Sequence, residues 1–389
     1  MRHEGGMPMS AGKEKMTAEL TSVGADAKQS PINTSVIIAD CGDFGNSENE
    51  NIDFDPRTLD PRYIETVTMQ ALLDTAFLPK LPIIEGLLYP GTYLMAGSPK
   101  IGKSFLVTQI GYAVATGTPL WNMPVRKGSV LYLALEDDKA RLQTRLSRMY
   151  GIEAADNFHF ATRSKCVENG LVQQLEGFIR SHSDTRLIII DTLQKVRGAD
   201  GEKYSYANDY QIIAALKALT DKLPVAIIIV HHTRKQDADD KFDMISGTTG
   251  LLGAADGAFL LHKEKRTSGD AELDVVGRDQ QDSRFNLKFQ NENCSWELVG
   301  SETELWRDPP DPLLDSIASL VNEDSPLWEG SATELALRIG CELMPQHLSR
   351  KLNVNISRLL KDYCVLYAPF RTHDGRKIRL MYMGGKDAL

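Results

Sequence analysis

Short aliphatic runs alternate with longer amphipathic stretches between about residues 90 and 300. The aliphatic runs are rich in β-branched residues and predict strands over Thr92–Ala96, Ser129–Leu135, Arg186–Asp191, Ala226–Val230 and Gly257–Leu261. The stretches between them predict helices over Lys103–Thr116, Asp138–Tyr150, Gly170–Ser181 and Tyr206–Lys222. Nearly continuous apolar strands separated by helices are typical of a parallel sheet that is covered on both faces. We therefore expect an α/β core whose sheet is mostly parallel.

The remaining patterns divide the chain into domains. Alternating residues in "AELDVVG" (271–277) and "RFNLKF" (284–289) predict a hairpin or meander that finishes the sheet. The stiff, polar "RDPPDP" predicts a linker over residues 307–312, after a core domain over residues 61–306. Residues 313–389 contain helical patterns and then two strand-like runs around Asp374-Gly375, which predicts a hairpin and a small α+β domain of the winged helix-turn-helix type. Residues 1–60 lack periodicity, and we expect a disordered extension there.

Composition narrows the class of protein. The 389 residues are 42% hydrophobic and 25% charged, as in soluble globular proteins. No apolar run approaches the ~20 residues of a membrane helix, and no signal-peptide pattern opens the chain. The five cysteines form no CxxC pair, so neither a zinc site nor a disulfide framework is predicted. We expect a cytoplasmic protein without membrane partners. The net charge of −9 argues against a broad basic surface but permits local phosphate-binding patches.

The segment "GSPKIGKS" (Gly97–Ser104) matches the P-loop pattern GxxxxGK[ST]. It follows a predicted strand and opens a predicted helix, a context that disfavours a chance match in a glycine-bearing loop. Lys103 would contact the β- and γ-phosphates of ATP, and the Ser104 hydroxyl would bind Mg²⁺. The predicted nucleotide-binding residues are Gly97, Ser98, Pro99, Lys100, Ile101, Gly102, Lys103, Ser104 and Phe105.

Acidic residues end two of the predicted strands. Asp191 closes "RLIIID" and is the expected Walker B carboxylate that holds Mg²⁺, although an aspartate at a strand end is common in unrelated folds. Glu136 directly follows the strand of "LYLALEDD", where a carboxylate can deprotonate the water that attacks the γ-phosphate. The alternative is that the acids there only begin the next helix, a role that suits Asp137 or Asp138. We assign the general base to Glu136.

The order of the segments "GSPKIGKS", "ALED", "IIIDT" and "VHHT" resembles that of RecA-like P-loop ATPases. Within them the chain is most similar to the RepA-type hexameric DNA helicases of plasmids, phages and mobile elements, which are relatives of DnaB-type replicative helicases. The resemblance covers about Leu81–Gly300. The later "WEGSATELA" and "GRKIRL" also resemble the winged-helix tails of mobile-element proteins.

Paired histidines end the strand run "AIIIV". Successive strand side chains point to opposite faces, so His231 and His232 are not expected to bind one metal ion together. The resemblance implies that His232 is a sensor of the γ-phosphate and that His231 is structural. A plain strand end remains the alternative.

The resemblance also implies sites for DNA and for a neighbouring subunit. Loops after Walker B and after the sensor would face a central channel and contact single-stranded DNA through Lys195, Arg197, Lys203, Arg234 and Lys235. Solvated surface loops are the alternative. Arg278 has the spacing of the DnaB-type arginine finger, with Arg266, Lys263 and Lys265 as rivals and a plain surface arginine as the alternative. RepA-type proteins carry an arginine where this chain has Ser246, which departs from their pattern.

Two functions remain open from the sequence. The leading hypothesis is an ATP-hydrolysing motor, a homohexameric replicative helicase of a mobile element that moves on single-stranded DNA. Its C-terminal domain would contact duplex or forked DNA through the basic residues Arg376, Lys377 and Arg379. The alternative is a RecA- or KaiC-like ATPase switch that regulates DNA binding or recombination without unwinding. A non-enzymatic protein is disfavoured because Lys103, Ser104, Glu136 and Asp191 are all present.

Overall fold

The computed structural model describes residues 60–197, 206–233, 249–263, 265, 268–278, 280–303, 309–373 and 375–384. Residues 1–59, and with them nearly all of the expected disordered extension, lie outside this part. The predicted strands and helices of the core are present, with ends that differ by a few residues at most. Its elements up to the end of the parallel sheet are β1 (Gly91–Gly97), α3 (Lys103–Thr116), β2 (Ser129–Ala134), α4 (Lys139–Tyr150), β3 (Phe158–Ala161), η3 (Val167–Asn169), α5 (Leu171–Ser181), β4 (Thr185–Asp191), η4 (Leu193–Lys195), α6 (Tyr206–Thr220), β5 (Ala226–His232), α7 (Thr249–Ala254) and β6 (Gly257–His262).

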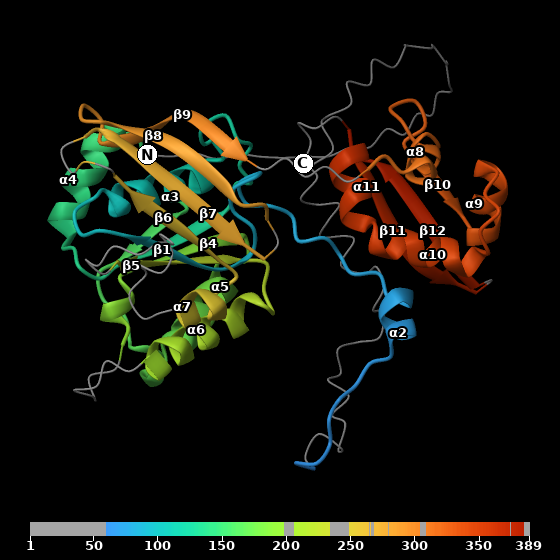
Figure 1. Ribbon diagram of the computed structural model, residues 1–389, viewed down its shortest axis with the longest axis horizontal. Coiled ribbons are helices and arrows are strands. Elements are labelled where there is room, and N and C mark those ends of the chain that lie inside the picture. Colours follow the sequence, from blue (N-terminus) through green and yellow to red (C-terminus); the bar gives the residue numbers. More distant parts are fainter. Residues whose placement is uncertain are drawn as a thin grey trace, which may run out of the picture.

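The core contains a nine-stranded sheet with the order β3-β2-β4-β5-β1-β6-β7-β8-β9. The first six strands in this order pair in parallel. The last three, β7 (Asp270–Gly277), β8 (Ser283–Gln290) and β9 (Ser295–Thr303), form the predicted antiparallel meander. Figure 1 shows α5, α6 and α7 together on one face of this sheet. The prediction of an α/β core with a mostly parallel sheet is confirmed.

Each face of the sheet has its own apolar core. On one face, Leu106 and Ile110 of α3 pack with Ile189 and Ile228 of the central strands, all at most 1% exposed. The other face packs against α5, α6 and α7. Because both faces are covered, the central strands read as continuous apolar runs and the polar residues are confined to the strand ends.

An ion-pair network ties together the strands of the antiparallel extension. Asp274 accepts a hydrogen bond from Arg284 Nε at 2.6 Å and faces His262 Nε2 at 3.0 Å, while Glu272 lies 3.2 Å from the same nitrogen. Burial raises the pKa of Asp274, but its bonds to His262 and Arg284 outweigh burial and lower that pKa to about 2. The network therefore fixes β7 and β8 in register with each other and beside β6.

The C-terminal region has a separate sheet and core. Its three strands follow the order β10-β12-β11, and all neighbours are antiparallel. Leu335, Leu348, Leu359 and Leu380 are fully buried and lie in one apolar cluster. The expected hairpin is present, although Asp374 itself lies outside the described residues. The elements are α8 (Pro312–Ala318), β10 (Leu327–Gly330), α9 (Ala332–Ile339), α10 (Pro345–Val354), α11 (Ile356–Tyr363), β11 (Val365–Thr372) and β12 (Gly375–Tyr382).

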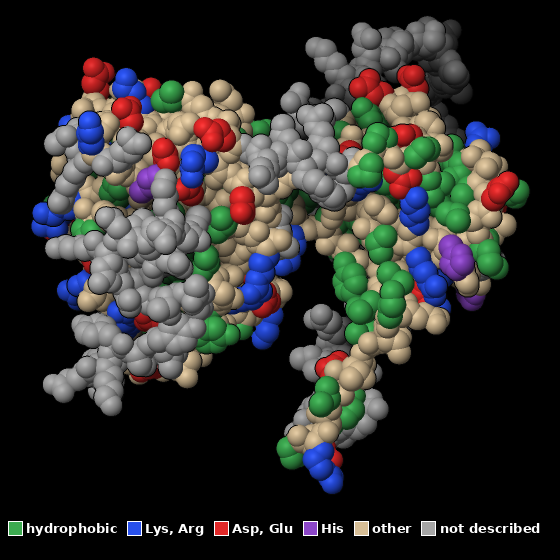
Figure 2. Space-filling view, in the orientation of Figure 1, with side chains coloured by type: hydrophobic (Ala, Val, Ile, Leu, Met, Phe, Trp, Pro, Cys, Tyr) green, Lys and Arg blue, Asp and Glu red, His purple; other side chains and the backbone are tan. Residues whose placement is uncertain are grey.

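A short helix before the core, α2 (Met69–Asp74), packs against the C-terminal region. Arg350 Nε of α10 donates to Asp74 Oδ1 at 2.6 Å, and Asn353 Nδ2 donates to the Leu73 carbonyl at 3.1 Å. The predicted core domain of residues 61–306 includes α2, and the structure shows α2 in contact with α10. In Figure 2, apolar side chains are visible along the segment that contains α2. No helix among the described residues is long and apolar enough to cross a membrane.

Candidate functional site

The P-loop joins β1 to α3 through backbone conformations that favour glycine. Gly102 has φ of 111°, and a Cβ there would lie 2.8 Å from the Trp296 ring. A Cβ on Gly97 would lie 2.5 Å from the Leu261 carbonyl oxygen. The two glycines therefore allow the loop to pack closely against β6 and β9. No side chain caps the N-terminus of α3, so its first N–H groups remain available for an anion.

Lys103 is folded back onto this loop. Its Nζ donates to the Gly97 carbonyl at 2.7 Å and the Ser98 carbonyl at 3.0 Å, and lies 3.3 Å from His232 Nδ1. The residue is 5% exposed. Burial lowers the pKa of Lys103 to about 8, against the opposing effect of Asp191 and Glu136. A phosphate group would restore the charge partner that these neutral contacts lack.

Ser104 and Asp191 contact each other at the carboxyl ends of the parallel strands. Ser104 Oγ donates to Asp191 Oδ2 at 2.8 Å, and the buried Tyr132 hydroxyl donates to the same oxygen at 2.9 Å. Burial raises the pKa of Asp191, although both hydrogen bonds lower it. Tyr132 was missed in the sequence. A buried tyrosine needs a partner for its hydroxyl, but the strand pattern does not identify that partner.

The three acids after β2 have different contacts. Asp138 caps α4 by accepting from Arg141 N at 2.8 Å, and Asp137 pairs with Arg145 at 2.8 Å. Glu136 is exposed, and its Oε1 accepts from Thr192 Oγ1 at 3.1 Å. Thr192 directly follows Asp191, so this bond joins the ends of β2 and β4. Of the three carboxylates, Glu136 is the one that neither caps a helix nor forms an ion pair in the described residues.

The two histidines lie at the end of β5, beside the P-loop. His231 pairs in register with Ala96 and is 7% exposed, whereas His232 pairs with Gly97 and contacts Lys103. Burial lowers the pKa of His232, and the Lys103 charge lowers it further. The neutral imidazole is thus favoured, and it lies where it can contact a group bound by Lys103.

An aromatic cluster supports the start of α3. Trp296 is fully buried, and its Nε1 donates to the Gly102 carbonyl at 3.2 Å. Phe289 packs against both Trp296 and Phe105. Lys263, a rival for the arginine finger, lies 5.2 Å above the Trp296 ring and donates to the Ser268 carbonyl. This support from β9 was also missed, because nothing in the sequence links residue 296 to the P-loop.

Arg278 lies near the amino ends of the parallel strands, whereas the P-loop lies at their carboxyl ends. Gly97 pairs with Leu261 at the P-loop edge, whereas Gly277 pairs with Gly257, which itself pairs with Tyr93. The four residues from Tyr93 to Gly97 span about 13 Å at ~3.3 Å per residue. Arg278 is exposed and donates to the Gly253 carbonyl at 2.9 Å. The structure therefore does not bring Arg278 to the Lys103 site of its own chain.

The residues predicted to contact DNA are placed only in part. Lys195 is exposed at the end of η4, while Arg197 pairs with Asp209 at 2.7 Å. Lys265 is exposed. On β12, Arg376 is exposed and Lys377 is half-buried, whereas Arg379 forms an ion pair with Glu329. Three predicted DNA residues lie outside the described part of the chain: Lys203, Arg234 and Lys235. Arg266, a rival for the arginine finger, and Ser246 also lie outside it.

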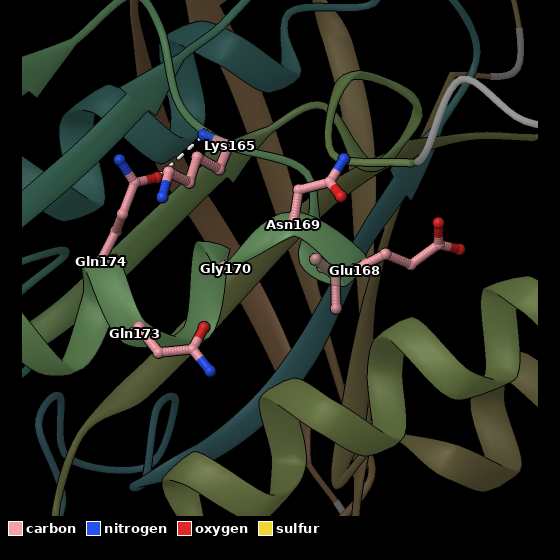
Figure 3. Close-up of a pocket in the computed structure, with 7 residues that line it drawn as sticks. Lys165, Glu168, Asn169, Gly170, Gln173 and Gln174 are labelled. Carbon is pink, nitrogen blue, oxygen red and sulfur yellow. Dashed lines mark hydrogen bonds between the residues drawn. The ribbon is translucent and has the colours of Figure 1, made fainter.

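Charges of both signs are interspersed on the face shown in Figure 2, which agrees with the absence of a broad basic surface there. A pocket of about 560 Å³ opens at the start of α5, and Figure 3 shows Lys165, Asn169, Gln173 and Gln174 around it. It adjoins the Walker B segment, because Val167 N donates to the Val196 carbonyl at 3.0 Å. The pocket therefore flanks the first predicted DNA loop and not the P-loop.

The described residues fit ATP with Mg²⁺. The uncapped N-terminus of α3 and Lys103 suit a polyphosphate, and the Ser104 hydroxyl beside the Asp191 carboxylate offers hard oxygen ligands for Mg²⁺. These groups come from the ends of neighbouring strands in a parallel sheet, the usual place for a ligand in such folds.

Comparisons with known proteins agree with the motifs. A family model described as an AAA domain matches residues 59–238, a range that contains the P-loop, Glu136, Asp191 and His232. No curated protein matches. The family match and the observed fold confirm the resemblance to RecA-like P-loop ATPases, whereas the narrower likeness to RepA-type helicases stays a prediction.

Similar solved structures include an ATPase domain, a replicative helicase and a KaiC-like protein. The ATPase domain has a TM-score of 0.44 and 18% identity, over 54% of this chain and 85% of that one. A DnaB-like replicative helicase, described with its primase interactions, has a TM-score of 0.43 and 18% identity, over 54% of this chain and 57% of that one. A KaiC-like protein from Pyrococcus horikoshii has a TM-score of 0.40 and 13% identity, over 58% of this chain and 99% of that one.

The pKa of Lys103 predicts how nucleotide affinity depends on pH. Well below pH 8 the ammonium is charged with and without nucleotide, so the Lys103 proton should leave the affinity unchanged. Above about pH 8 the free site loses this proton and must regain it to bind phosphate, so affinity should fall by up to about tenfold per pH unit. Titration with a non-hydrolysable ATP analogue measures this. Lys103→Arg stays charged and should give a flat profile; a flat profile for the unmodified protein would contradict the assignment.

Proposed function

We propose that this protein is an ATP-dependent DNA motor, a ring-forming replicative helicase of a mobile element that hydrolyses ATP at subunit interfaces. One observation carries the proposal. Lys103, Asp191, Glu136 and His232 share one edge of the sheet, while Arg278 is exposed at the other edge. An arginine finger so far from its own site acts on the site of another copy, which requires an assembly. The homohexamer follows from the resemblance to DnaB-type and RepA-type helicases.

In the proposed mechanism, each residue of the site has a separate task. Lys103 and the N-terminus of α3 would hold the phosphates, and Ser104 and Asp191 would hold Mg²⁺, which would neutralise charge on the phosphate oxygens. Glu136, oriented by the Thr192 hydroxyl, takes the proton of the attacking water. His232 lies 3.3 Å from Lys103 Nζ and senses the γ-phosphate. Arg278 of a neighbouring copy stabilises the charge of the transition state.

The proposed path of single-stranded DNA passes the loop that follows Walker B. Lys195 is exposed there, two residues before Arg197, and the adjacent pocket is lined by the polar groups of Lys165, Asn169 and Gln173. A groove with cations and amides suits a sugar-phosphate backbone and carries no sequence preference. The second predicted DNA loop, which follows β5, lies outside the described residues.

The C-terminal domain is proposed to be a winged helix that contacts duplex or forked DNA. Its order of one helix, one short strand, further helices and a hairpin supports this assignment. Arg376 lies directly after the turn of the hairpin, paired in register with the exposed Arg371, so two cations face solvent at its tip. Cations at such a tip suit a phosphate backbone.

A RecA- or KaiC-like switch remains the second candidate. It would use the same nucleotide site, and the Asp74–Arg350 pair between α2 and the C-terminal domain is a contact through which such a switch could act. Strand displacement separates the two functions.

Glu136→Gln should retain ATP binding and lose hydrolysis by about 10²–10⁴-fold, because the general base is removed without loss of shape. Steady-state ATPase assays and analogue titrations measure the two effects. Asp137→Asn is the matched control, since Asp137 already pairs with Arg145. If Asp137→Asn is the inactive variant and Glu136→Gln is active, the base is assigned to the wrong residue.

A forked DNA with one labelled strand tests the motor directly. We expect strand displacement that requires ATP and Mg²⁺, and its absence in Lys103→Ala, whose site lacks the cation that holds the phosphates. Forks with a single 5′ or 3′ tail reveal the direction of movement. ATP hydrolysis that is stimulated by DNA without any strand displacement would instead support the switch.

The full-length Arg376→Ala/Lys377→Ala variant tests the C-terminal domain. If both cations contact phosphates, the slope of log affinity against log salt on duplex DNA should fall in magnitude by about 1.8, or 0.9 per contact. Basal ATP hydrolysis should be unchanged, because the nucleotide site lies in another domain. Lys139→Ala/Arg180→Ala removes two exposed cations of α4 and α5 as a control. Equal slopes for all three proteins would show that this hairpin does not bind DNA.

A further inference from the structure

Asp256 joins two elements, β1 and α6, near Arg278. Its Oδ2 accepts from the Thr92 backbone N–H at 2.9 Å, and its own N–H donates to the Thr92 carbonyl at 2.8 Å. Lys217 of α6 forms an ion pair with Oδ1. The Asp256 side chain is only 13% exposed, so these bonds are shielded from solvent. Asp256 is thereby fixed to β1 and to α6 at the same time.

Arg278 forms one bond to this fixed point and a second bond to α7. Its backbone N–H donates to the Asp256 carbonyl at 2.8 Å. Its guanidinium Nη2 donates to the Gly253 carbonyl at 2.9 Å, at the end of α7. The backbone bond is internal, whereas the side chain is exposed, so the guanidinium can exchange its carbonyl partner for another acceptor while its backbone stays in place.

Close packing leaves Asp256 little freedom. A Cβ on Gly91 would lie 3.0 Å from Asp256 Oδ2, and a Cβ on Gly257 would lie 2.4 Å from the Val276 carbonyl oxygen. Larger residues at these two positions would push Asp256 away from Thr92 or β6 away from β7. The backbone that carries Arg278 is therefore set by the position of Asp256 to within a small range.

We propose that Asp256, held by Lys217, is a positioning residue that sets the reach of Arg278 toward the ATP site of a neighbouring copy. This inference rests on the proposed function, in which Arg278 acts in trans. The carboxylate orients the Asp256 backbone through Thr92 and Lys217, and the Asp256 carbonyl then fixes the backbone of Arg278. Without these bonds, Arg278 would remain in the chain but would sample positions away from the transition state.

The test compares Asp256→Asn and Lys217→Met with Asp221→Asn in the full-length protein. The asparagine loses the ion pair and cannot accept at both side-chain atoms, so we expect kcat to fall by about tenfold or more with KM for ATP unchanged within about twofold. Lys217→Met should show the same fall in kcat with an unchanged KM for ATP. Asp221 is the other, half-exposed partner of Lys217, and Asp221→Asn should keep the normal kcat.

Two further measurements separate positioning from general support. Asp256→Asn combined with Arg278→Ala should be no slower than Arg278→Ala alone, because the positioned group is already absent. Mixing Asp256→Asn with Glu136→Gln should restore part of the activity, since some interfaces then pair an intact base with a well-placed arginine. Thermal unfolding shows whether Asp256→Asn is folded. If it is not, both measurements are made with Lys217→Met, which keeps the bond between Asp256 and Thr92.

The outcomes distinguish this inference from the function on which it rests. Normal kcat for Arg278→Ala would overturn the trans-acting arginine itself. A collapse of kcat for Arg278→Ala together with normal kcat for Asp256→Asn and Lys217→Met would overturn the positioning role alone. A double variant that is slower than Arg278→Ala, or no gain on mixing, would show that Asp256 only supports the fold.

Discussion

The nucleotide site depends on two opposite charges that are buried among neutral partners. Lys103 and Asp191 are each 5% exposed. Lys103 contacts two carbonyls and an imidazole, and Asp191 contacts two hydroxyls. Burial consequently lowers the pKa of Lys103 and raises that of Asp191, so each charged form is disfavoured. A polyphosphate and a divalent cation together would supply both missing partners, which favours joint binding over binding of either alone.

The strand order explains why the residues of this site lie at the carboxyl ends of the parallel strands and why Arg278 lies away from them. The neighbours β2, β4, β5 and β1 end at the same edge, and they carry Glu136, Asp191, His232 and the P-loop. The extension β7–β9 reverses direction, so its first turn carries Arg278 to the far edge. In the same extension, Trp296 of β9 donates a hydrogen bond to the Gly102 carbonyl of the P-loop. One segment thus supports its own P-loop and, in the proposed assembly, completes the site of a neighbour.

The sequence predicts what depends on local patterns. Strands, helices and the P-loop follow from periodicity and spacing, and the distinction between Glu136 and its two neighbours follows from their distance to the strand. Contacts between distant segments were not predictable: Tyr132 with Asp191, Trp296 with Gly102, and α2 with α10. The four-residue β3 is too short for its alternation to be distinctive. Asp256 was missed because its role depends on bonds to residues 92, 217 and 278.

The distribution of charge favours an assembly over a single copy for any function on DNA. The chain carries a net charge of −9. In the C-terminal domain, Arg350, Lys351 and Arg379 pair with carboxylates, whereas Arg371 and Arg376 are exposed at the tip of the hairpin. In the core, Arg197 is paired while Lys195 is exposed. A few phosphate contacts per chain give weak, salt-sensitive binding. Several copies on one strand multiply these contacts without a basic surface, because each further contact is then intramolecular. In the proposed function, one assembly would therefore supply both the neighbour at the ATP site and the further contacts on DNA.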